Sequence, residues 1–186
     1  MAGVNLPVLF GGGLAGGIVI LYGSRMVRQE WGTSQAGADG QASVTGTVGK
    51  ALSLAQALVG APYSMAGHAG AISETVAQVK QLGTDCSGYV SDLMGPNGLG
   101  IWNTAYATPN IAGAPGIMPG KGSQVTLWND PAPGSAGHVW IEFDLPGGVS
   151  RYFEEASGVG AHEMTAAQAQ QYLSSGQYQP YHPQGY

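Results

Sequence analysis

The order of local patterns constrains this chain of 186 residues more than any other feature, because helical periodicity comes first and strand-like alternation follows. Helix caps and glycine stops predict three helices, over residues 47–59, 73–82 and 85–94. Alternating runs predict three strands, over residues 125–128, 138–143 and 151–155. A last surface helix is predicted over residues 165–173. Helices followed by hairpin-linked strands predict an α+β fold, with helices packed on a small antiparallel sheet.

The N-terminal segment, residues 1–32, differs from the rest because its stretch from Leu6 to Tyr22 contains no charged residue. As a helix this stretch would span ~25 Å, close to the minimum for crossing a bilayer. Two GxxxG spacings within it would let helices approach closely. We therefore expect a hydrophobic N-terminal helix that crosses a membrane or associates with itself or with other proteins. The two arginines that follow predict that the remaining chain stays in the cytoplasm of the cell that makes it.

Residues 33–48 are mostly Gly, Ala, Ser, Thr and Gln, which is the composition of a flexible linker. One domain is therefore predicted at residues 49–186. The chain has a net charge of -5 and only 9% charged residues, so it offers no basic surface for nucleic acid. A single cysteine excludes an internal disulfide, and the fold must rely on burial.

The only cysteine, Cys86, directly follows a predicted helix cap and so falls in the first turn of a helix. Unpaired N–H groups and the helix dipole stabilise a thiolate at such a position. Of the four histidines, only His138 opens a predicted strand, whereas His68 and His162 fall in loops and His182 in the C-terminal tail. Cys86 and His138 are therefore the predicted nucleophile and general base.

A third group must hold the imidazole of His138 in the useful tautomer, and the hairpin after His138 suggests which one. If residues 145–148 form a four-residue loop, His138 faces Glu155 across the two strands. The same register gives a charge pair and an aromatic pair: Glu142 with Arg151, and Trp140 with Phe153. A one-residue slip would bring Glu154 to His138 but would lose both pairs, so we predict Glu155 as the third residue.

Three short motifs in the domain resemble, in the same order, those of the NlpC-type peptidoglycan peptidases, and the likeness covers about residues 49–160. The motifs are Ala61-Pro62-Tyr63, Asp85-Cys86-Ser87-Gly88 and Gly137-His138-Val139. The resemblance implies a papain-like fold in which Cys86 is the nucleophile and His138 the base. It also implies that the Tyr63 hydroxyl assists at the oxyanion, and that Asp85 and Ser87 line the substrate side.

The chain departs from the family pattern at two places. The usual glycine pair after the tyrosine is Gly67-His68 here, which makes His68 a possible extra pocket residue. The third polar residue, often His, Asn or Gln in the family, would be the carboxylate of Glu155, which meets the same physical need.

The function predicted on this basis is a cysteine peptidase that hydrolyses amide bonds in peptidoglycan stem peptides, with no metal or other cofactor. Its expected partners are the peptide substrate and other virion proteins or itself, with a membrane possible and nucleic acid excluded. The charge pattern of residues 1–32 favours a phage tail or virion protein that acts on the cell envelope from outside, with a membrane-anchored bacterial enzyme as the alternative. Two other functions stay open: a non-catalytic tail-tip or channel protein, and a papain-like amidase or acyltransferase with another substrate.

Overall fold

The computed structural model describes residues 17–22, 25–30, 46–68, 71–132 and 137–186. The chain divides into two compact units, Met1–Gln41 and Ala42–Tyr186. The division falls within the predicted linker.

The described part of the first unit is a pair of antiparallel strands, β1 (Gly17–Tyr22) and β2 (Arg25–Glu30). The helix predicted from Leu6 onward is therefore wrong over residues 17–22, and residues 6–16 lie outside the described residues. Glycine weakens a helix here, and the β-branched run Ile18-Val19-Ile20 favours a strand. None of the helices in the described parts of the chain is long and apolar enough to span a bilayer.

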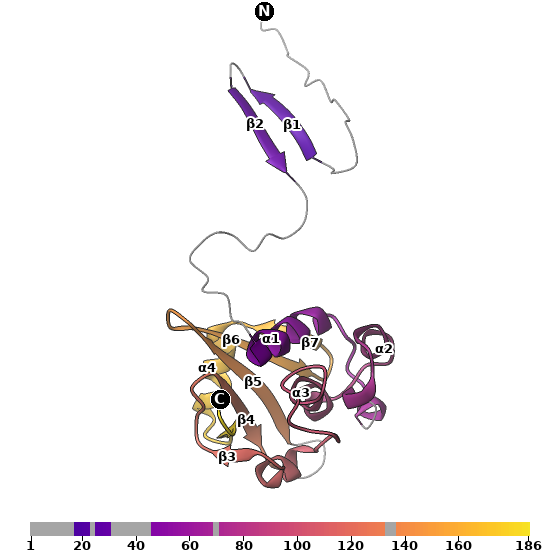
Figure 1. Cartoon of the computed structure of the whole chain (residues 1–186), viewed down its shortest axis with the longest axis vertical. Coiled ribbons are helices and arrows are strands. Elements are labelled where there is room, and N and C mark those ends of the chain that lie inside the picture. The colour runs from indigo at the N-terminus through magenta and orange to yellow at the C-terminus, as the bar shows by residue number, and fades with distance from the viewer. Residues whose placement is uncertain (1–16, 23–24, 31–45, 69–70, 133–136) are drawn as a thin grey trace, which may run out of the picture. The chain divides into compact units, whose positions relative to one another are not determined.

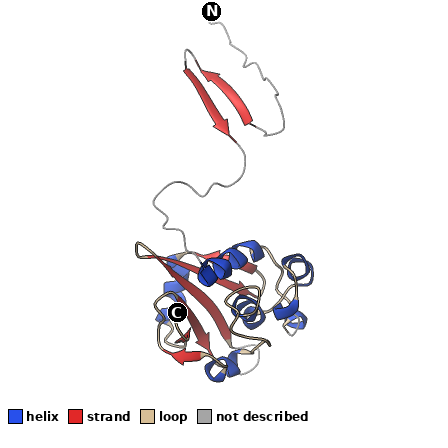
Figure 2. Ribbon diagram, viewed as in Figure 1, coloured by secondary structure: helices blue, strands red, loops and turns tan. Residues whose placement is uncertain are grey.

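The second unit contains a six-stranded antiparallel sheet with the order β3-β8-β4-β5-β6-β7 (Figures 1 and 2). The predicted α+β class and antiparallel sheet are thus confirmed. The three predicted strands are present and slightly longer: β4 (Val125–Asp130), β5 (His138–Leu145) and β6 (Val149–Ala156). Three short strands were not predicted: β3 (Ile117–Pro119), β7 (Gly160–Met164) and β8 (Gln179–Pro183).

The helices lie close to the predicted positions: α1 (Gly46–Leu58), α2 (Val76–Leu82), α3 (Cys86–Met94) and α4 (Ala166–Ser174). Short 3-10 turns occur at Met65–Gly67, Ala71–Ser73 and Thr108–Gly113. Two helices begin with a capping box, in which the cap side chain and the glutamine three residues later bond each other's backbone. These caps are Thr75 for α2 and Thr165 for α4.

The helices cover the two faces of the sheet unequally (Figure 1). Helices α1 and α3 pack on one face over the main core, which includes Val139, Ile141 and Phe153. Helix α4 packs on β6 and β7 from the other face, over a smaller cluster centred on Trp140. Successive side chains of β5 therefore point alternately into two buried layers, and the sheet face that carries Trp140 is also shielded from solvent.

The β5–β6 hairpin has a different register from the predicted one. Leu145 pairs with Val149, so the loop between the strands has three residues, and Phe143 rather than Glu142 faces Arg151. Phe153 pairs with Ile141 and not with Trp140. The predicted pairs of Glu142 with Arg151, Trp140 with Phe153 and His138 with Glu155 are therefore wrong.

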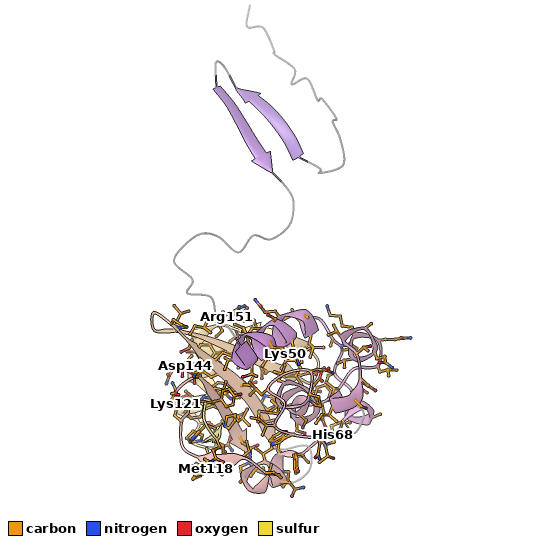
Figure 3. All side chains as sticks on the ribbon, in the orientation of Figure 1. Lys50, His68, Met118, Lys121, Asp144 and Arg151 are labelled. Carbon is orange, nitrogen blue, oxygen red and sulfur yellow. The ribbon has the colours of Figure 1, made fainter. Side chains whose placement is uncertain are left out.

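Neighbouring strands explain why this register is stable. Glu142 accepts hydrogen bonds from Lys121 and from the indole of Trp128, at 3.1 and 2.8 Å. Lys121 also lies 3.6 Å from Asp144, and the two residues are next to each other in Figure 3. Arg151 instead donates two hydrogen bonds, of 2.7 and 2.6 Å, to Glu163 on β7. Glu142 and Arg151, which were predicted to pair within the hairpin, are thus each paired with a residue outside it.

Candidate active site

Cys86 is the first residue of α3, as predicted, and it is almost fully buried, with 6% of its surface exposed. The N-cap residue Asp85 accepts a 2.6 Å hydrogen bond from the backbone N–H of Gly88. The backbone N–H groups of Cys86 and Ser87 have no partner inside the helix, because they belong to its first turn. The sulfur therefore lies beside N–H donors at the positive end of a helix dipole.

Glycine is required two residues after the cysteine because the backbone is crowded there. A Cβ at Gly88 would collide with the hydroxyl of Thr84 and lie 3.1 Å from the Cα of His68. Gly67 meets the same restriction, since a Cβ on it would collide with the backbone of Gly83. This close packing fixes residues 67 and 68 against the start of α3.

His138 begins β5, and its imidazole forms hydrogen bonds with both Cys86 and the carboxyl group of Glu154. Its Nε2 donates a 2.7 Å hydrogen bond to Oε2 of Glu154. Burial alone would lower the pKa of His138, but hydrogen bonds to Cys86 and Glu154, together with their negative charge, raise it to about 9. The imidazole of His138 therefore lies between the Cys86 sulfur and the Glu154 carboxyl group, and its raised pKa favours the imidazolium form.

The carboxylate that contacts His138 belongs to Glu154 and not to the predicted Glu155. Glu154 lies on the same face of the sheet as His138, while Glu155 points to the α3 side because adjacent strand residues face opposite ways. The one-residue difference in hairpin register is the whole cause of this error, since a one-residue slip moves every side chain to the other face.

A second histidine shares the same carboxylate. His162 on β7 lies directly opposite Glu154 in the β6–β7 ladder, and its Nε2 is 3.1 Å from Oε1 of Glu154. Its Nδ1 lies 3.0 Å from the carbonyl oxygen of Gly160. Both oxygens of Glu154 thus face an imidazole, and its side chain is only 4% exposed. The sequence prediction missed His162 because β7 was not foreseen.

Two tyrosines form an aromatic wall against His138. The ring of Tyr172 on α4 lies 5.5 Å from the imidazole, centroid to centroid, and the ring of Tyr178 lies 6.3 Å away, edge on. Burial, and then the negative charge and hydrogen bonding of Glu154, raise the pKa of Tyr172 to about 12. The sequence prediction assigned no role to either tyrosine. Together they shield the imidazole and favour its strong bond to Glu154.

Tyr63 lies beside the cysteine, as the motif resemblance implied. Its backbone forms a parallel bridge with Thr84, two residues before Cys86. Burial, and then the charges of Cys86, Asp85 and Glu155, raise the pKa of Tyr63. Its hydroxyl donates to the sulfur of Met65 at 3.1 Å. Thioether sulfur is a weak acceptor, so an oxyanion could readily take this donor.

Asp85 and Ser87, which the motif resemblance placed on the substrate side, both contact His68. Nδ1 of His68 is 2.9 Å from Oδ1 of Asp85 and 3.3 Å from the Ser87 hydroxyl, which itself donates to Asp85 at 3.0 Å. Burial would raise the pKa of Asp85, but hydrogen bonds from His68, Gly88 and Ser87 lower it below its ordinary value. The hydrogen bond to Asp85 in turn raises the pKa of His68. Figure 3 shows His68 on a side of the molecule away from Lys121 and Asp144.

Glu155 has a different environment. Its side chain is fully buried, and neither carboxyl oxygen has a hydrogen-bond partner of good geometry among the described residues. Burial raises its pKa to about 9; the Thr84 backbone opposes this shift, and the charge of Asp85 adds to it. Glu155 is therefore a neutral acid near neutral pH, packed against Thr84, which precedes the N-cap of α3.

The site thus joins Cys86, His138, Glu154 and His162, with Tyr63 beside the sulfur and two tyrosines beside the imidazole. Among the described residues, no group of three or more His, Cys, Asp or Glu side chains has a geometry suited to holding a metal ion. Searches of protein-family models, curated proteins and solved structures found no significant match to this chain.

Proposed function

We propose that this protein is a cysteine hydrolase that cleaves amide bonds in peptidoglycan stem peptides. The observation that carries the chemistry is the chain of contacts from Cys86 through His138 to Glu154, with the imidazole pKa raised to about 9. The substrate rests on the motif resemblance to the NlpC-type peptidases, which also motivates a papain-like core. In this proposal Glu154, and not Glu155, takes the place of the family's third polar residue, which is often His, Asn or Gln.

The proposed reaction begins when the thiolate of Cys86 attacks the substrate carbonyl carbon. Negative charge then develops on the carbonyl oxygen, where the first N–H groups of α3 and the hydroxyl of Tyr63 can donate hydrogen bonds. The imidazolium of His138 gives its proton to the leaving amine as the C–N bond breaks, which leaves a thioester. His138 then takes a proton from water, whose oxygen attacks the thioester and restores the free sulfur.

Glu154 and His162 support these steps without touching the reacting atoms. The carboxylate of Glu154 fixes which imidazole nitrogen faces the sulfur, and it stabilises the imidazolium. His162 faces the other carboxylate oxygen and so restricts rotation of Glu154. The virion setting stays a prediction from the charge pattern of residues 1–32.

The test is digestion of purified muropeptides by the full chain, with products identified by mass spectrometry. We expect two peptide fragments whose masses add up to the mass of the substrate plus one water, and no products from the Cys86→Ala variant. Ser53→Ala, at an exposed position on α1, is the matched control and should match wild type. No cleavage by wild type would favour the structural role, and transfer of the acyl group to an added amine instead of water would favour an acyltransferase.

A further inference from the structure

A pocket of about 410 Å³ lies beside Glu154, between α4 and the segment before β8. This volume is at the lower end of the range for small-molecule sites, about 300–1,000 Å³. Its walls include Gln168, Gln171, Tyr172, Gln177 and Tyr178. The pocket has no role in the proposed reaction as derived above.

The pocket adjoins the catalytic machinery through shared residues. Glu154 lines it and also holds His138, and the rings of Tyr172 and Tyr178 separate it from the imidazole. The negative charge of Cys86 contributes to raising the pKa of both tyrosines, so the sulfur lies within electrostatic range. The pocket is therefore adjacent to the residues that hold His138.

The charges around the pocket favour a neutral group. None of the described residues that line it is a lysine or an arginine, so a ligand carboxylate would find no cation there. Glu154 cannot readily pair with a ligand ammonium, because His138 and His162 already face its two oxygens at 2.7 and 3.1 Å. A charged part of a stem peptide would pay for its desolvation without gaining a partner.

The polar groups instead suit a ligand with many hydroxyl and amide groups. Glutamine amides both donate and accept, and the side chains of Gln171 and Gln177 are exposed at the pocket. The hydroxyl of Ser175 donates to the Tyr172 carbonyl and so offers its lone pairs to a ligand. The tyrosine rings add flat apolar surface on which the C–H face of a sugar ring can pack.

We propose that this pocket binds an N-acetylated sugar of the glycan strand, so that the enzyme recognises stem peptides still attached to glycan. The inference rests on the proposed function for its choice of sugar. It adds a second contact region that raises affinity for the intact wall over free peptide.

Binding is measured on the full-length Cys86→Ala variant, which cannot turn over its ligand. Two ligands are titrated separately by NMR: a disaccharide muropeptide and the same stem peptide without sugar. We expect the muropeptide to bind at least about fivefold more tightly. A trimer of N-acetylglucosamine should shift the resonances of Gln171 and Gln177 without any peptide present.

The pocket is tested with Gln171→Ala plus Gln177→Ala, at exposed positions where the fold should tolerate the change. This pair should abolish the preference for the muropeptide, while Gln81→Ala, an exposed glutamine on α2, should retain it. Equal affinity for the two ligands, or a preference that survives the double substitution, overturns the inference. Hydrolysis by wild type is scored separately: an active enzyme without sugar preference refutes only the pocket, and sugar binding by an inactive protein refutes only the peptidase.

Discussion

Glu154 and Glu155 are adjacent in sequence, yet they face opposite sides of the sheet, and only Glu154 contacts His138. We predict that Glu154→Gln lowers turnover of muropeptides by about 100-fold or more, because an amide neither stabilises the imidazolium nor fixes its tautomer. Glu155→Gln should stay within a few-fold of wild type. The rates are compared at saturating substrate, so that binding differences do not enter. A larger loss at Glu155 would show that the hairpin register described above is wrong.

The burial of Glu155 predicts an unusual pH dependence of stability. Its pKa of about 9 in the folded chain lies above its ordinary value of 4.5, so the folded state holds a proton that the unfolded state has lost between these values. The free energy of unfolding should therefore fall as pH rises from about 5 to 9, by on the order of 3 kcal/mol. Glu155→Gln should remove most of this slope.

Denaturant unfolding at a series of pH values measures the effect. Glu163→Gln is the control, because that carboxylate pairs with Arg151 at the surface and should leave the slope intact. An identical slope in wild type and Glu155→Gln would mean that Glu155 is ionised in the folded protein.

The side chain of Asp85 caps the start of α3 and also forms a hydrogen bond with His68. Asp85→Asn should keep the cap bond to Gly88, whereas Asp85→Ala should lose about 1–2 kcal/mol of stability with it. The asparagine variant weakens the hydrogen bond that raises the pKa of His68 and removes the carboxylate charge that adds to the effect. Because folding raises the pKa of His68, the protonated imidazole stabilises the folded wild type at pH values below the pKa of His68 in the unfolded chain. This stabilisation is lost as the pH rises through the pKa of His68 in the folded chain. Asp85→Asn should lose this component.

Urea unfolding of the two variants at pH 5.5 and pH 8 separates the contributions. The asparagine variant should approach wild type at the higher pH, and the alanine variant should be weaker at both. Equal stability of Asn and Ala variants at pH 8 would contradict the capping role.

At the scale of elements, the sequence was informative wherever a local signal decides the structure. The cap at Asp85 and the stop after Met94 place α3 at the predicted residues, because capping depends only on the neighbouring backbone. His138 likewise begins a strand as predicted. Both halves of the Cys86–His138 contact could therefore be identified without a structure.

The third residue could not be identified in this way because it depends on a register that distant strands fix. Glu142 and Arg151 seemed to pair, but Lys121 and Glu163 satisfy them from other parts of the sheet. Leu145, counted in the loop, extends the strand instead. The short strand β7 and its His162 carry too little apolar alternation to be seen in isolation.

At the scale of the whole molecule, the two units are predicted to be energetically independent. Removal of residues 1–41 should leave the melting temperature and the muropeptide turnover of the second unit within error of the full chain, because its core is built from residues 48 and beyond. Calorimetry and the digestion assay check this. A loss of several degrees in melting temperature would show that the first unit contributes to the fold of the second.

We propose that His138 and Glu154 hold the Cys86 sulfur as a reactive thiolate, and the reactivity of the sulfur can be measured without knowing the substrate. The rate of alkylation by iodoacetamide is followed by intact mass from pH 5 to 9 for wild type, His138→Ala and Glu154→Gln. We predict rapid alkylation of wild type already at pH 6, a slower rate in Glu154→Gln, and reaction of His138→Ala only near pH 8.5, where an ordinary thiol ionises. A wild-type profile that coincides with that of His138→Ala would contradict the account.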